Sequence, residues 1–383
     1  MIYFDNPATT FPKPQCVLEE ISKCMKEYCG NPGRSSHKLS IESAEKIYET
    51  RTIISDFFGA SPENVVFTYN TTYALNIAIK SFLKFNTHIL ISDIEHNAVL
   101  RPVASLASNN LCSYSTFSTD GDDDEIIENI KKSLTKDTSM LICTHVSNLG
   151  SKRLPIEKIG TLCKEKNIFF IVDGAQSAGI YDIDVQKMNI GALCIPAHKS
   201  LYGPQGIGVI VLGTDKIGRC LIEGGTGINS LDTSMPDFLP ERYEAGTLST
   251  PLISGLCEAL KWLRKVNTKS IRTHEENLYK IACDLLSTND RVTIYKMSPS
   301  LGNTILFNVS GISSSSLANS FDKRSICVRS GFHCSPLAHK KLQTGPGGAV
   351  RIGFSVYNTK KEIYEFIEAL NEITKESKKP IIS

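Results

Sequence analysis

The stretch ALCIPAHKSLYGPQGIGVIVL (192–212) places a cationic lysine, Lys199, preceded by His198, between two short apolar runs. The runs, ALCIP (192–196) and GIGVIVL (206–212), have the length and composition of buried strands. Lysine is mostly an exposed residue, so a lysine directly after a buried strand needs an explanation. That explanation has to come from the residues that the fold brings close to Lys199.

Upstream of this stretch, short apolar runs alternate with helical patterns. The runs are NVVFT (64–68), THILIS (87–92), SMLICT (139–144) and IFFIVD (168–173). Helix-like segments such as 41–58 and 155–167 lie between them. This alternation predicts an α/β fold, with a mostly parallel sheet covered by helices on both faces.

After residue 250 the rhythm changes. Two helical stretches lead into NTILFNV (303–309), a serine-rich helix start (313–321), further short apolar runs and a closing helix. We expect a smaller α+β domain with its own sheet. The predicted boundaries are 15–257 for the large domain, and 1–14 with 258–383 for the small domain.

Composition and charge are those of an ordinary soluble globular protein. The 383 residues are 41% hydrophobic and 21% charged, with a formal net charge of +2, which argues against nucleic acid or an anionic membrane as partner. No run approaches the roughly 20 apolar residues needed to cross a bilayer, and the N-terminus does not resemble a secretory signal. We therefore expect a cytoplasmic protein with twelve reduced cysteines. No C-x-x-C pair occurs, and no metal site is expected.

Polar residues follow several predicted strands, where open parallel sheets bind their ligands. They are Thr71, Thr72, Glu95, His96, His145, Asn148, Asp173, Gln176, His198 and Lys199. Pyridoxal 5'-phosphate requires an amine for a Schiff base and usually an acid beside its ring nitrogen, and Lys199 and Asp173 supply that pair. The helix start at TTYALNIAI (71–79) offers backbone amides to a phosphate.

Each of these residues also has an ordinary explanation when it is taken alone. Asp173 alone fits an Asp-Gly turn, His96 a structural histidine, and the Thr71-Thr72 pair a helix cap. Their occurrence together, at successive strand ends, favours a cofactor site.

The motifs resemble those of the class V, fold-type I aminotransferase group and, within it, the cysteine desulfurases. The matching segments are YFDNPATT, NTTYALNIA, IEHNA, THVSNLG, VDGAQSAG, HKSLYGPQGIG, YEAGTLST, VRSGFHCSPLAH and VRIGFSVYNT, which run nearly end to end. The RSGFHC stretch is similar to the SufS-type branch and its selenocysteine-lyase relatives. The resemblance implies a fold-type I transferase that uses pyridoxal 5'-phosphate and forms a homodimer.

The resemblance also implies a role for each matching position. Lys199 would hold the cofactor as a Schiff base and act as acid and base, and Asp173 would pair with the pyridine nitrogen. His96 would stack on the ring and shuttle protons, so that it counts with Lys199 and Cys334 as a catalytic residue. The other cofactor contacts would come from Thr71, Thr72, Asn148, Gln176 and His198 and, from a second subunit, Thr247. The substrate would be bound by Asn148, Arg329 and Arg351, with Arg351 clamping its carboxylate.

Cys334 lies in a loop, VRSGFHCSP, whereas the other cysteines lie mainly in helix-like or strand-like runs. Positive charge from Arg329 and His333 would favour its thiolate. The resemblance implies that Cys334 takes sulfur from L-cysteine as a persulfide, that L-alanine is released, and that a protein accepts the sulfur. The sequence leaves open the identity of that acceptor, the preference between L-cysteine and L-selenocysteine, and whether the loop is ordered.

The segment before Lys199 departs from the family pattern. Pro196 and Ala197 stand where SufS-type relatives usually carry a serine or threonine and a glycine, so we expect a missing phosphate contact and weaker cofactor retention. An extra residue, Ser200, also puts the specificity in doubt. Two other functions stay open: a selenocysteine lyase, aminotransferase or epimerase-like enzyme that does not need Cys334, and a non-catalytic interaction or scaffold subunit.

Overall fold

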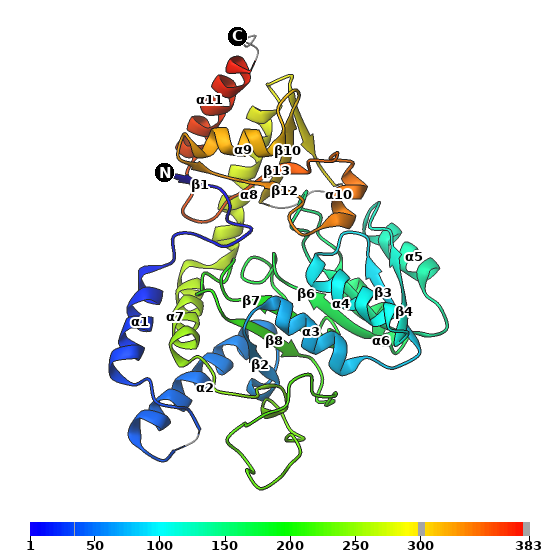
Figure 1. The fold of residues 1–383 in the computed structure, drawn as a ribbon, viewed down its shortest axis with the longest axis vertical. Coiled ribbons are helices and arrows are strands. Elements are labelled where there is room, and N and C mark those ends of the chain that lie inside the picture. The colour runs from blue at the N-terminus through cyan, green and yellow to red at the C-terminus, as the bar shows by residue number, and fades with distance from the viewer. Residues whose placement is uncertain (34, 298–302, 378–383) are drawn as a thin grey trace.

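A computed structural model describes residues 1–33, 35–297 and 303–377, and in this part of the chain the strands form three sheets (Figure 1). The largest has seven strands in the order β2-β8-β7-β6-β5-β3-β4. Their bounds are β2 (Val65–Thr68), β3 (Thr87–Ser92), β4 (Cys112–Phe117), β5 (Thr138–Thr144), β6 (Phe169–Asp173), β7 (Ala192–Pro196) and β8 (Gly208–Leu212). All are parallel except β8, which is antiparallel to both of its neighbours. The predicted mostly parallel α/β sheet is confirmed.

Helices cover both faces of this sheet, which is why its central strands are apolar throughout. One face packs against α3 (Thr71–Phe82) and α4 (Asn97–Ser108), and Ile171 of β6 points to that side. The other face packs against α2 (Lys38–Phe58), α5 (Asp123–Ser133), α6 (Ile156–Glu165) and α7 (Thr250–Val266), and receives Phe170 and Val172. Helix α1 (Gln15–Glu27) lies against α7.

The second sheet is antiparallel and has the order β12-β13-β10-β9. Its strands are β9 (Val292–Tyr295), β10 (Thr304–Val309), β12 (Arg329–Gly331) and β13 (Ala349–Gly353). Helices α8 (Thr268–Leu286), α9 (Ser314–Asp322) and α11 (Lys360–Glu376) share a separate core with this sheet. The short helix α10 (Pro336–Leu342) follows β12.

The N-terminal segment lies with the C-terminal part of the chain. Strand β1 (Ile2–Tyr3) pairs in parallel with β11 (Ile326–Cys327), and Phe4 is fully buried in the core of the second sheet (Figure 1). This arrangement agrees in kind with a small domain that combines both ends of the chain, although the expected boundaries stay a prediction. Among the described helices, none is long and apolar enough to span a bilayer.

Candidate active site

A pocket of about 550 Å³ lies at the carboxyl ends of the parallel strands. Eight of the predicted site residues line it: Thr71, Thr72, His96, Asn148, Asp173, Gln176, His198 and Lys199. They follow or end β2, β3, β5, β6 and β7, so the topology gathers side chains that are up to 128 positions apart in the sequence. Glu95 and His145, which also follow strands, are buried outside this pocket.

Lys199 and Asp173 both line the pocket, and each influences the pKa of the other. Desolvation lowers the pKa of Lys199 to about 8, and although Asp173 opposes that shift, Arg351 and Arg329 add to it. Desolvation raises the pKa of Asp173, whose Oδ1 accepts a hydrogen bond from the backbone N–H of Ala175 at 2.9 Å. A lysine with this pKa is partly neutral near physiological pH, and a neutral amine can attack a carbonyl or take a proton.

The start of α3 forms the polar wall of the pocket. Asn70 caps the helix by accepting from the backbone N–H of Tyr73 at 3.0 Å. Thr71 Oγ1 and His198 Nδ1 are buried and have no hydrogen-bond partner among the described residues. Unpartnered buried polar atoms are unusual, and here two of them occur beside a helix N-terminus, which attracts anions. The site therefore fits a bound phosphate group.

His96 presents a neutral ring to the pocket. It caps α4, and its Nδ1 accepts from the backbone N–H of Ala98 at 3.0 Å, which leaves the proton on Nε2. Burial, together with the nearby charge of Lys199, lowers the pKa of His96 to about 4. A flat, uncharged ring in a fixed tautomer suits stacking on an aromatic cofactor.

Arg351 approaches from the second sheet. It is 2% exposed, and its Nη2 lies 3.0 Å from Asp5 Oδ1, whereas its Nε is buried without a partner in the described residues. Arg329 stands opposite Arg351 in the β12–β13 pairing. The unpartnered Nε leaves Arg351 able to bind a further anion, such as a carboxylate.

The loop that carries Cys334 is held against the rim of the pocket. Asn148, which lines the pocket, donates from Nδ2 to the carbonyl oxygen of His333 at 3.0 Å and accepts at Oδ1 from Ser335 Oγ at 2.7 Å. The carbonyl oxygen of Cys334 accepts a hydrogen bond from the backbone N–H of Asn97 at 2.7 Å. Cys334 itself is an exposed residue. Several hydrogen bonds therefore hold the loop, with its exposed cysteine, beside the pocket.

One electrostatic expectation for this loop is wrong. His333 is buried, and burial with the charge of Arg351 lowers its pKa to about 2. Its ring is neutral at physiological pH and supplies no positive charge to the Cys334 thiolate. The sequence pattern does not reveal this because it cannot show that the ring turns inward.

Sequence reasoning gave no role to the N-terminal segment, which contacts the Lys199 loop. The carbonyl oxygen of His198 accepts hydrogen bonds from the backbone N–H of Thr10 at 3.1 Å and from Lys13 Nζ at 2.6 Å. Thr10 Oγ1 also donates to the carbonyl oxygen of Lys199 at 3.0 Å. The YFDNPATT motif marked this region as part of the family pattern, but contacts across nearly 190 residues leave no local signal.

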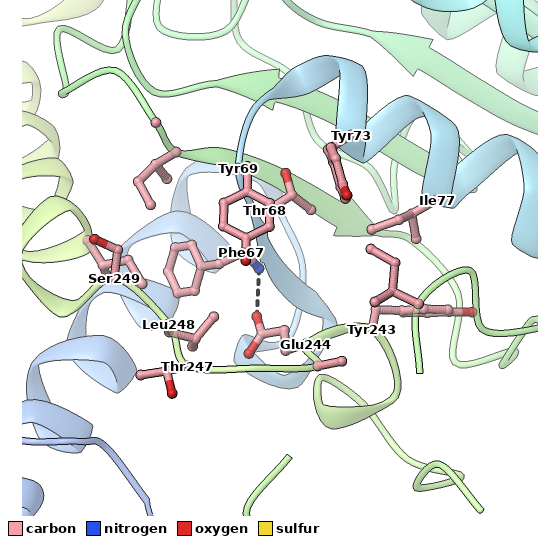
Figure 2. Close-up of a pocket in the computed structure, with 15 residues that line it drawn as sticks. Phe67, Thr68, Tyr69, Tyr73, Ile77, Tyr243, Glu244, Thr247, Leu248 and Ser249 are labelled. Atoms are coloured by element: carbon pink, nitrogen blue, oxygen red, sulfur yellow. Dashed lines mark hydrogen bonds between the residues drawn. The ribbon is translucent and has the colours of Figure 1, made fainter. Parts of the chain in front are cut away.

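Thr247 lies in a different pocket, also of about 550 Å³ (Figure 2). Figure 2 shows it beside Leu248 and Glu244, and the Glu244 carboxylate accepts from the backbone N–H of Phe67 at 2.6 Å. Tyr69 and Tyr73, which flank the start of α3, line the same pocket. A single chain therefore does not bring Thr247 into the Lys199 pocket.

Comparison with known proteins gives one consistent family. Residues 2–366 match the family model described as aminotransferase class-V. The chain is 31% identical to the "Probable cysteine desulfurase" of Pyrococcus abyssi, over 98% of this chain and 94% of that protein. It is 27% identical to the "Cysteine desulfurase" of Haloferax volcanii, over 97% and 89% of the two chains. An apo structure of a cysteine desulfurase from Thermococcus onnurineus NA1 matches with a TM-score of 0.89 and 30% identity, covering 98% of this chain and 95% of that one.

Proposed function

The chain belongs to the aminotransferase class-V family and, within it, to the cysteine desulfurases, and we propose that it removes sulfur from L-cysteine with the help of pyridoxal 5'-phosphate. L-alanine is released and the sulfur stays on Cys334 as a persulfide. The observation that carries the proposal is the juxtaposition of a lysine–aspartate pocket with a pinned, exposed cysteine at its rim.

The residues of the pocket fit the cofactor. Lys199 would hold its aldehyde carbon, Asp173 would face the ring nitrogen, and His96 would cover the ring. The phosphate would be bound at the start of α3 by Thr71, Thr72 and His198, where two buried polar atoms have no partner in the described part of the chain. Gln176, whose Nε2 donates to the carbonyl oxygen of Pro7 at 3.0 Å, is held at the edge of the pocket for a ring substituent. When bound, the cofactor supplies an electron sink for the α-carbon of the substrate.

Arg351 and Lys199 act on different parts of the amino acid, the α-carboxylate and the α-proton. Arg351 binds the α-carboxylate with its unpartnered Nε, while Asp5 keeps the guanidinium in place. Arg329 adds positive charge beside it, and Asn148, which lines the pocket, contacts the substrate. Lys199, with its pKa lowered to about 8, takes the proton from the α-carbon.

Cys334 performs the sulfur transfer. Its thiolate attacks the substrate sulfur, a sulfur–sulfur bond forms, and the bond between that sulfur and the β-carbon breaks. The β-carbon keeps the electron pair and is protonated, and Lys199 returns a proton to the α-carbon, which gives L-alanine. One L-cysteine and one Cys334 thiol thus become one L-alanine and one Cys334 persulfide, with no oxidant or reductant consumed.

A second copy of the chain is expected to complete the site. The pocket of Figure 2 contains both Thr247 and the exposed rings of Tyr69 and Tyr73, which border the start of α3. In a two-fold dimer the same patch meets itself, so the Thr247 of one subunit is brought to the α3 start of the other. We therefore place Thr247 in the cofactor site of a homodimer. A cytoplasmic location, a protein sulfur acceptor and L-selenocysteine as a second substrate belong to the same proposal.

Mass spectrometry after incubation with L-cysteine and pyridoxal 5'-phosphate tests the function. We expect one added sulfur atom on the peptide that carries Cys334, and one L-alanine released per persulfide in the first turnover. After borohydride reduction, we expect a pyridoxyl group on Lys199. The variant Cys334→Ser should abolish persulfide and L-alanine formation, and Cys29→Ser, which alters another exposed cysteine, should not. Continued L-alanine release by Cys334→Ser would contradict the proposal and favour an enzyme that does not need this thiol.

A further inference from the structure

A chain of hydrogen bonds runs behind the Cys334 loop through two buried imidazole rings. His333 Nδ1 lies 3.2 Å from His339 Nε2, and the two rings are nearly parallel, with 9° between their planes. His339 Nδ1 lies 2.7 Å from Thr344 Oγ1, and His333 Nε2 lies 3.3 Å from the carbonyl oxygen of Arg329. The chain thus ties the residue before Cys334 to α10 and to β12.

The donor and acceptor of each of these hydrogen bonds can be assigned from the group at the end of the series, the carbonyl oxygen of Arg329. A carbonyl oxygen can only accept, so His333 donates from Nε2 to Arg329, and its Nδ1 accepts from His339 Nε2. His339 Nδ1 then accepts from the hydroxyl of Thr344. Each ring carries one proton and no charge, in agreement with burial, which lowers the pKa of His333 to about 2 and that of His339 to about 4.

The backbone at Cys334 needs such support. His333 and Cys334 have φ angles of 49° and 57°, in the left-handed region that residues other than glycine seldom adopt. Two such residues in succession persist only where surrounding contacts hold them. Asn148 holds the backbone on the side of the pocket, and the imidazole chain holds the side chain of His333 on the other side.

We propose that His339 is a positioning residue for Cys334, which acts through His333 to fix the turn that presents the thiol at the rim of the Lys199 pocket. The inference rests on the proposed function, because it concerns the step in which Cys334 takes up sulfur. Both rings are neutral, so the role is geometric and leaves the charge at the thiol unchanged. A misplacement of about 1 Å in a reacting group costs about 100-fold in rate.

Three variants of the full-length holoenzyme test the role of His339. His339→Ala removes the donor to His333, whereas His339→Gln keeps an N–H that can reach it. The matched control is His88→Gln, because His88 is also buried and lies 2.9 Å from the hydroxyls of Thr138 and Ser115, at the far end of β3 from the pocket.

For His339→Ala we expect persulfide formation on Cys334 to slow by about 10- to 100-fold. Rapid quench with mass spectrometry measures this rate. The KM for L-cysteine and the affinity for pyridoxal 5'-phosphate should stay within about twofold, since neither ligand touches the imidazole chain. His339→Gln should recover much of the rate, and His88→Gln should keep all of it. Equal losses in His339→Ala and His88→Gln would assign the effect to general destabilisation and overturn the inference.

The amide of Asn97 gives a readout that does not depend on activity. Asn97 is the first residue of α4, so its N–H has no acceptor within the helix, and it donates to the carbonyl oxygen of Cys334 at 2.7 Å. Hydrogen exchange at Asn97 should become faster in His339→Ala and stay unchanged in His88→Gln. Unchanged exchange with an unchanged persulfide rate would refute the inference. Failure of the wild type to form persulfide would instead refute the proposed function, and the exchange measurement would still decide the role of His339.

Discussion

When Asp5 is neutralised, a bound amino acid should stabilise the protein against thermal unfolding more than it stabilises the wild type. In the variant Asp5→Asn the side chain keeps its shape, but Arg351 loses the anion that lies 3.0 Å from its Nη2. Arg351 is 2% exposed, so its charge then has little access to water. A substrate carboxylate can then compensate that charge.

The size of the effect follows from burial. Removing one partner of a buried ion pair costs about 3–5 kcal/mol. Because the Asp5 side chain is 23% exposed, water replaces part of the interaction, and we expect about 2–3 kcal/mol. Unfolding entropy is about 2.1 cal/mol/K per residue, so for 383 residues each kcal/mol lowers the Tm by about 1 °C. The variant should therefore melt about 2–4 °C lower than the wild type.

Thermal denaturation of the holoprotein with increasing L-alanine is the assay. L-alanine carries the α-carboxylate but no sulfur, and it should raise the Tm of Asp5→Asn by about 2–3 °C more than that of the wild type. Glu244→Gln is the control, because Glu244 and Arg51 form a similarly buried ion pair outside the Lys199 pocket. That variant should lose stability without a larger response to L-alanine. An equal response in Asp5→Asn and wild type would refute the assignment of Arg351 as the carboxylate site.

Three further predictions concern the cofactor. The apoprotein should bind pyridoxal 5'-phosphate faster as the pH rises through about 8, because the amine of Lys199 attacks the aldehyde only after losing its proton. The rate is measured by absorbance, and a rate that does not depend on pH would contradict this prediction. Pro196→Ser should tighten cofactor binding about 2- to 10-fold in equilibrium titrations, the value of one added hydrogen bond, and an unchanged affinity would count against a missing phosphate contact. Mixing inactive Lys199→Ala with Thr247→Ala subunits should restore activity to about a quarter of the sites, since one site of each mixed dimer is intact; no recovery would place Thr247 outside the partner's site.

The strands that the sequence predicted well are those buried on both faces. The runs at 168–173 and 192–196 coincide closely with β6 and β7, because a strand covered by helices on both sides is apolar at every position. Strand β4 (Cys112–Phe117) was missed because it forms the edge of the sheet, and Ser113 and Tyr114 are exposed. The reversed direction of β8 was not predicted either, since composition and periodicity carry no information on strand direction.

The site also contains residues that the sequence predicted and residues that it did not. Residues at strand ends, such as Asp173 and Lys199, were found because the carboxyl ends of parallel strands share one edge of the sheet. The contacts of Asp5 and Lys13 were not found, because they depend on how the N-terminal segment crosses the molecule. The neutral state of His333 was also missed, since it depends on burial, which the order of residues in a loop does not reveal.

The N-terminal thirteen residues connect the two chemical halves of the site. Ile2 and Tyr3 pair with β11, Asp5 binds Arg351, and Lys13 and Thr10 bind the carbonyl oxygen of His198, next to Lys199. The group that would receive the substrate carboxylate and the peptide that orients the lysine are therefore contacted by the same short segment. A change in the anion at Arg351 acts on Asp5 directly, and Asp5 lies only five residues from Thr10. The segment is far from Arg351 and Lys199 in sequence, yet it holds both the guanidinium and the backbone next to the lysine, so both halves of the site depend on its position.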